Sequence, residues 1–166
     1  MQPKHDIFPV QVPVALYCLW NSRDLLDAWQ HCLYDRYDWM VMLIWCIPLI
    51  IIRFFPPDER ASGNTQAIYT GTGLLFSFIG TIGSLNLLTY AGLAVVIAGW
   101  LPFSWVQFVW ILSALSWMPA LGWIGSRFFL DHILMVRVFL SITASAWISY
   151  HTVTQRKRQR CLAINR

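Results

Sequence analysis

A few cysteines and histidines and one arginine, set among apolar residues, are the side chains of this 166-residue chain that suit chemistry. A cysteine nucleophile needs a nearby cation to lower the pKa of its thiol and a histidine to carry the proton. Cys46 lies in an apolar run, and Cys32 lies beside His31 in a more polar stretch. Arg137 stands seven residues into an apolar segment that starts at Leu130. A thiol paired with Arg137 and a histidine is therefore the sharpest enzymatic hypothesis.

Two histidines flank Arg137 in the same segment. Asp131 and His132 stand at its start and His151 at its end. On a helix, Asp131 and His132 lie about one and a half turns from Arg137, which strains a direct pair but permits a water-bridged cluster. An arginine in hydrocarbon is costly unless it is paired or hydrated, so Arg137 is a functional candidate, although we favour structural anchoring as its role.

No cysteine lies in a catalytic or metal-binding motif. Cys18, Cys32, Cys46 and Cys161 include no CxxC pair and no His/Cys spacing of the kind that a zinc site requires. No motif indicates a cofactor, and we expect neither a metal nor a cofactor. A buried cysteine is commonly a small apolar filler, which is our interpretation of Cys46.

The composition indicates an integral membrane protein. The chain is 57% hydrophobic and 12% charged, whereas soluble domains are about 25% charged. Its length allows about five or six spans of roughly 20 residues each. Five of the twelve basic residues lie in the last eleven positions, which fits a topology signal better than a nucleic-acid patch. We therefore expect the lipid bilayer and other membrane proteins as partners, and no nucleic acid.

Apolar segments divide the chain. Five are clear, at residues 39–55, 67–83, 85–100, 106–129 in part and 130–150, and a shorter sixth covers residues 7–20. We predict an all-α polytopic bundle of about six transmembrane helices plus one amphipathic helix on the outer surface, with five spans as the alternative. Residues 1–154 then form a single bundle domain, and residues 155–166 form a basic tail.

The basic run predicts the orientation. Arg156, Lys157, Arg158 and Arg160 directly follow the last apolar segment, and such clusters stay on the cytoplasmic side during insertion. Alternation then places residues 21–38, with four aspartates against two arginines, on the outer side. We predict a multi-pass protein of the bacterial inner membrane with a cytoplasmic C-terminus.

Residues 21–38 carry their own helical pattern. Leu25, Leu26, Trp29, Leu33 and Tyr37 recur at three- and four-residue steps, which predicts an amphipathic helix on the outer surface. Ser22 is the predicted cap of this helix.

Small residues form a stripe in the segment 67–83 and its neighbour. The predicted helix-packing positions are Gly73, Ser77, Gly80 and Ser84, with Gly92 and Gly99 as the matching face. Small residues let helices approach closely in lipid, so we predict helix packing here, with a ligand groove as the alternative. Trp45, Trp110 and Trp117 lie deeper than the other tryptophans, and we interpret them as packing residues.

The layout resembles the N-terminal part of the exosortase/archaeosortase family of multispan transpeptidase-like proteins. The resemblance rests on residues 25–37 leading into 39–41 and 47–49, on the glycine-rich segment 70–83, and on residues 87–93 through Gly99 and Trp100 to 115–119. Exosortase-like enzymes carry a nucleophilic cysteine in an Ala-Cys-Ser-Gly type motif after these spans, followed by an arginine and a histidine. No cysteine lies between Gln107 and Gln159, so the resemblance implies a truncated or non-catalytic relative.

Three functions follow as expectations. The first is a non-catalytic accessory or scaffold protein of a membrane assembly, in exosortase-type protein sorting or polysaccharide export. The second is a membrane-embedded cysteine transpeptidase that uses Cys46 or Cys32 with Arg137 and a histidine. The third is a small transporter or cofactor-binding subunit. The scarcity of intramembrane carboxylates argues against proton-coupled transport.

Overall fold

A computed structural model describes residues 8–32, 35–54, 63–101, 105–119, 125, 127–129 and 132–164, with the backbone alone at 8–9, 52–53, 63 and 155–164. Within these ranges the regular elements are all helical, so the predicted all-α class is confirmed. The elements are α1 (Phe8–Asn21), α2 (Asp24–His31), α3 (Asp38–Trp45), α4 (Ile47–Phe54), α5 (Gly63–Ile82), α6 (Asn86–Ala98), α7 (Trp105–Ser113), the 3-10 helix η1 (Ala114–Trp117) and α9 (Ile133–Ile164).

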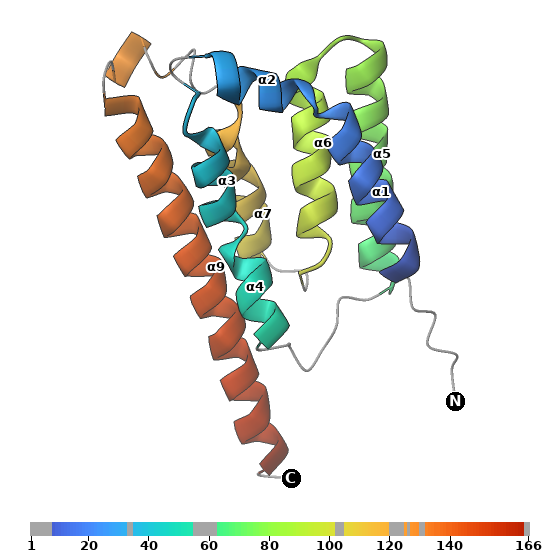
Figure 1. Cartoon of the computed structure of the whole chain (residues 1–166). Coiled ribbons are helices and arrows are strands. Elements are labelled where there is room, and N and C mark those ends of the chain that lie inside the picture. The colour runs from blue at the N-terminus through green and yellow to red at the C-terminus, as the bar shows by residue number, and fades with distance from the viewer. Residues whose placement is uncertain are drawn as a thin grey trace.

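The long helical segments run alternately up and down. In Figure 1, α1, the α3–α4 pair, α5, α6, α7 and α9 alternate in direction, and α2 lies across one end of the bundle. The start of α1 and the end of α9 point to the opposite end. We call these the α2 end and the tail end. The helices correspond in order to the six apolar segments predicted from the sequence.

One described helix is long and apolar enough to cross a membrane. The stretch Ile133–Thr154 of α9 has 22 residues, and only 33% of its most apolar window is buried within the bundle. Shorter apolar helices occur at Asp38–Ile51, Asn86–Ala98 and Trp105–Trp117. Helix α9 continues to Ile164, so the predicted boundary at residue 154 is not a break in the backbone. The side chains of Arg156, Lys157, Arg158 and Arg160 lie outside the described part of the chain.

Proline breaks the second apolar segment into α3 and α4. Pro48 has no N–H, and its ring crowds the carbonyl four residues earlier, which belongs to Ile44. The helix is interrupted at Cys46, and the Ser145 hydroxyl of α9 donates to the Ile44 carbonyl at 3.1 Å. A side chain of the neighbouring helix thus replaces the missing backbone donor.

Helices α5 and α6 touch through glycine. A Cβ on Gly73 would lie 2.7 Å from the Gly92 carbonyl oxygen, and one on Gly92 would lie 2.6 Å from the Gly73 carbonyl oxygen. Along the same contact, Gly80 faces Thr89. This backbone-to-backbone contact excludes any side chain at Gly73 or Gly92 without movement of a helix.

The remaining stripe residues divide into two groups. Ser77 is fully buried, and its backbone faces Gly92. A Cβ on Gly99 would lie 2.9 Å from the Tyr69 Cβ, so Gly99 also meets α5. Ser84 was predicted in the stripe, but it lies in the turn beyond α5, exposed and with a φ of 53°. Ser84 therefore belongs to the turn and not to the helix contact.

Helix α2 is short and lies across the α2 end of the bundle (Figure 1). Leu25 is buried and Trp29 packs against the core, whereas Leu26 and Tyr37 are exposed, and Leu33 lies outside the described residues. The predicted Ser22 cap is wrong. The Ser22 hydroxyl donates back to the Cys18 carbonyl at 2.8 Å, because Ser22 closes α1 instead of opening α2.

Candidate functional site

Two aspartates meet in a turn at the α2 end. The Asp38 amide donates to the Asp35 carbonyl at 3.0 Å, and the Asp35 amide donates to the Cys32 carbonyl at 3.2 Å. This turn brings both carboxylates beside the start of α3, where the partial positive charge of the helix end favours them. Asp38 is fully buried and Asp35 is 6% exposed.

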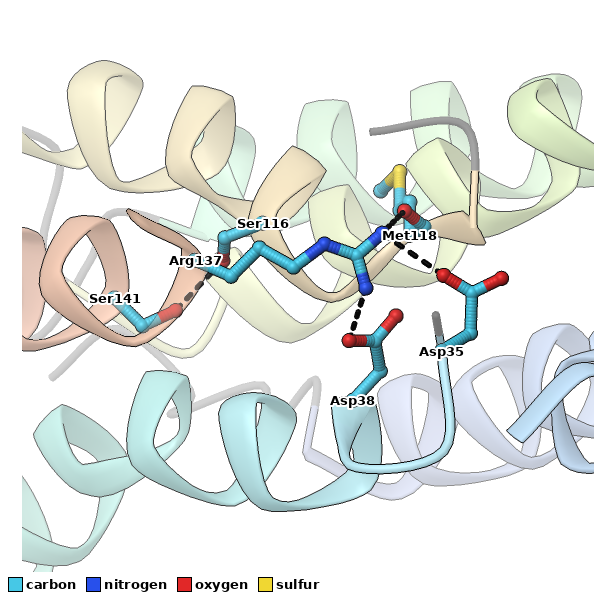
Figure 2. Close-up of polar contacts among 6 residues, drawn as sticks. All are labelled: Asp35, Asp38, Ser116, Met118, Arg137 and Ser141. Carbon is cyan, nitrogen blue, oxygen red and sulfur yellow. Dashed lines mark hydrogen bonds and ion pairs between the residues drawn. The ribbon is translucent and has the colours of Figure 1, made fainter. Parts of the chain in front are cut away.

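A fully buried arginine of α9 joins the two aspartates. The Arg137 guanidinium donates through Nη1 to Asp38 Oδ1 and through Nη2 to Asp35 Oδ1 at 2.9 Å. The Met118 carbonyl, just after η1, lies 3.5 Å from Nη2. Figure 2 shows the guanidinium pointing into the space between the two carboxylates. We call Asp35, Asp38, Arg137 and the Met118 carbonyl the Arg137 cluster.

Ion pairs and one hydrogen bond in the Arg137 cluster hold three chain segments together. A guanidinium presents its donors in a planar fork, which lets one side chain engage two carboxylates from one turn. Removing one member of a buried ion pair typically costs about 3–5 kcal/mol, because the remaining charge is left without compensation. The second oxygen of Asp38, Oδ2, is buried and has no hydrogen-bond donor among the described residues. The chain segments held together are the α2–α3 turn, the end of η1 and α9.

Polar contacts continue down α9 below the cluster. The Ser141 hydroxyl, one turn beyond Arg137, lies 2.6 Å from the Ser116 hydroxyl of η1 (Figure 2). The Ser145 hydroxyl, another turn on, donates to the Ile44 carbonyl of α3. Arg137, Ser141 and Ser145 thus form a stripe at four-residue spacing, which ties α9 to η1 and α3.

A tryptophan cluster fills the space between α3 and α7. Trp45 Nε1 donates to the Trp110 carbonyl at 2.9 Å and to the Ser113 hydroxyl at 3.1 Å, and Trp110 Nε1 donates to the Trp45 carbonyl at 3.1 Å. The two rings stack 4.2 Å apart, and Trp117 meets Trp45 edge-on at 5.7 Å. All three side chains are fully buried. They pack helices, as we predicted for the deep tryptophans.

The structure separates the candidate catalytic histidines from one another. His132 is exposed at the α2 end, just before α9. His151 is half-buried on α9, about 21 Å from Arg137 along the helix axis at 1.5 Å per residue. Asp131, which we expected in a water-bridged cluster with Arg137, lies outside the described residues.

The candidate thiols occupy two different levels of the bundle. Cys46 is half-buried at the α3–α4 break, about 12 Å below Asp38 along the helix axis. Cys32 is exposed at the α2 end and is a free thiol. Among the described residues, no group of three or more His, Cys, Asp or Glu side chains is placed to hold a metal ion.

Asp35 and Asp38 are the site residues that sequence reasoning missed, because both were counted only as topology charges. A signal was available. An arginine inside an apolar segment needs a carboxylate, and the predicted topology places Arg137 near the same outer end as residues 21–38. The predicted topology therefore indicates that Arg137 pairs with an aspartate of residues 21–38. It does not indicate which of the four aspartates is the partner.

Comparison with known protein families, with curated proteins and with solved structures finds no match for this chain. In the Arg137 cluster, one guanidinium between two carboxylates links three chain segments.

Proposed function

We propose that the chain is a multi-pass protein of the bacterial inner membrane that acts as a non-catalytic accessory or scaffold subunit of a membrane assembly. The proposed spans are α1, α3–α4, α5, α6, α7–η1 and α9. The tail end is cytoplasmic and the α2 end lies on the outer side. The resemblance to exosortase-type proteins suggests protein sorting or polysaccharide export as the setting.

The distribution of apolar side chains supports the membrane placement. Large apolar side chains are exposed on every proposed span, on α6 only at Leu87 in its first turn. They include Leu16 of α1, Ile50 of α4, Leu75 of α5, Phe108 of α7 and Phe139 of α9. A soluble helix turns a polar face to water, and soluble monomers rarely expose large continuous apolar patches. The outward faces of this bundle suit hydrocarbon instead.

The short central helix is compatible with this placement. Helix α6 has 13 residues, fewer than the roughly 20 that a lipid-facing helix needs to cross a bilayer. Residues from Thr89 to Ala98 are nearly all buried against the other helices. A helix enclosed by protein does not need to match the bilayer thickness along its own length.

The Arg137 cluster is the observation that carries the non-catalytic proposal. The guanidinium that would activate a thiol is engaged by Asp35 and Asp38. Cys46 lies about 12 Å from Asp38 along the helix axis, and His151 lies about 21 Å from Arg137 along α9. A guanidinium locked between carboxylates of a distant segment suits a rigid scaffold better than a nucleophile site.

A gentle-detergent affinity purification of the tagged chain from native membranes tests the proposal. We expect a stoichiometric partner protein, retained equally by the Cys32→Ala, Cys46→Ala double variant. Loss of the partner is expected for Arg137→Met, because the variant loosens the surface that the Arg137 cluster holds. A chain that purifies alone, or a cellular phenotype abolished by the double cysteine variant while the protein level is unchanged, contradicts the proposal.

A further inference from the structure

An apolar groove of about 650 Å³ lies between α5, α6 and α7. Helix α6 forms its floor with small side chains, Ala91 and Ala94, and α5 and α7 form its walls. No charged side chain is among its lining residues. On its rim, Ile68, Phe108 and Leu112 are exposed, so the groove opens sideways from the bundle.

Two of the three polar residues of the groove lie toward its tail end. Thr65 and Tyr69 are in the first half of α5, Thr72 lies midway along the helix, and the remaining lining residues are apolar. The Tyr69 hydroxyl donates to Gln107 Oε1 at 3.2 Å, and the fully buried Gln107 donates through Nε2 to the Ala98 carbonyl. This chain of hydrogen bonds fixes the Tyr69 side chain, which lines the groove, against α7 and the end of α6.

We propose that the groove binds an acyl chain of a phospholipid from the cytoplasmic leaflet, with the lipid's polar end beside Thr65 and Tyr69. The inference rests on the membrane placement under the proposed function, but not on the partner protein.

The dimensions favour a single lipid chain. From Thr65 to Phe76 the α5 wall is about 16 Å long at 1.5 Å per residue. That is about half of the roughly 30 Å hydrocarbon core, which is the share of one leaflet. The groove volume also falls in the range of about 300–1,000 Å³ that is typical of small-molecule sites. A partner's transmembrane helix would be apolar along its whole length and would place hydrocarbon against the Thr65 hydroxyl at the tail end of the groove.

Native mass spectrometry of the full chain purified in mild detergent tests the inference, with extraction and identification of the retained molecule. We expect a population carrying one phospholipid. Ala91→Phe fills the floor and Thr72→Phe narrows the wall, so each should remove the lipid-bound peak. Ala67→Phe is the matched control, because Ala67 is exposed on α5 and does not line the groove. This control should retain the lipid.

Several outcomes overturn the inference. The first is a wild-type chain that carries no lipid. The second is equal lipid retention in the wild type and in well-folded Ala91→Phe and Thr72→Phe variants. The third is retention of an isoprenoid lipid or a protein segment in place of a phospholipid. Unchanged melting temperatures establish that the variants fold, and either groove variant suffices if the other does not fold. If an alkaline wash releases the chain from membranes, the membrane placement itself is wrong. If the chain needs detergent for extraction but carries no lipid, only the proposal of a lipid in the groove is wrong.

Discussion

Arg137 is the residue on which the α2 end of the bundle depends. Replacing it by methionine leaves the buried Asp35 and Asp38 carboxylates facing each other without a cation. We expect the Arg137→Met variant to lose about 3–5 kcal/mol of unfolding free energy. The midpoint of thermal unfolding in detergent, followed by tryptophan fluorescence, measures the loss.

The same residue has an informative rescue. Adding Asp35→Asn and Asp38→Asn to Arg137→Met removes all three charges, and most of the lost stability should return, because buried ion clusters can be replaced by neutral groups at little net cost. An Arg137→Met variant as stable as the wild type would show that the ion pairs do not hold the fold together.

Trp45 offers a second test among buried residues. Trp45→Phe keeps an aromatic ring but removes the Nε1–H that donates to the Trp110 carbonyl and the Ser113 hydroxyl. We expect a loss of about 1–3 kcal/mol in unfolding free energy, measured by chemical denaturation in detergent. Trp105→Phe is the control, because Trp105 is 72% exposed, and it should change stability by less than about 0.5 kcal/mol. Equal effects at the two positions would mean that the hydrogen bonds contribute nothing measurable.

Single residues also show which features of the site can be predicted from the sequence. The chemistry of Arg137 identified it as costly in an apolar segment, and its burial agrees with that expectation. Its partners lie 99 and 102 residues away, and no local periodicity links positions so far apart. The Ser22 cap failed for a similar reason, since a serine between two helices can bond either one and only the backbone path decides.

At the level of elements, the α5–α6 contact makes the clearest prediction. Gly73→Ala places a Cβ 2.7 Å from the Gly92 carbonyl oxygen, so α5 and α6 must separate. We expect a loss of about 1–3 kcal/mol in stability, measured as a lower melting temperature. Gly71→Ala, two residues away, meets no atom within 4 Å and should be neutral or slightly stabilising, because alanine is the better helix former. A Gly71→Ala variant that melts lower than Gly73→Ala would refute this account of the stripe.

The helical segments were predictable because apolar runs separated by prolines, glycines and polar turns are a strong signal. Pro48 marks the α3–α4 interruption in the sequence. The donor that compensates for it could not be predicted, since the Ser145 hydroxyl that donates to the Ile44 carbonyl lies on α9, 101 residues away. Ser84 fits the four-residue spacing of the stripe, yet α5 ends at Ile82 and the chain turns there. Spacing alone does not tell where a helix stops.

For the whole molecule, the arrangement of the ends agrees with the alternation inferred from charges. Helix α1 begins and α9 ends at the tail end, and α2 crosses the opposite end (Figure 1). The Arg137 cluster lies at the α2 end, and the polar groove residues Thr65 and Tyr69 lie toward the tail end. The two ends of the bundle therefore differ in chemistry.

Orientation is testable with the cysteines of the chain. Cys32 is exposed at the α2 end, and Cys161 follows the basic run. In intact cells with a permeabilised outer membrane, a maleimide that cannot cross the inner membrane should label a variant retaining only Cys32 and spare one retaining only Cys161. Replacing Arg156, Lys157, Arg158 and Arg160 by glutamine should make part of the Cys161 population reactive, because the charges proposed to hold the tail inside are gone. Labelling of Cys161 in the otherwise unaltered tail would reverse the proposed topology, whereas an unchanged pattern in the glutamine variant would show that orientation is determined elsewhere in the chain.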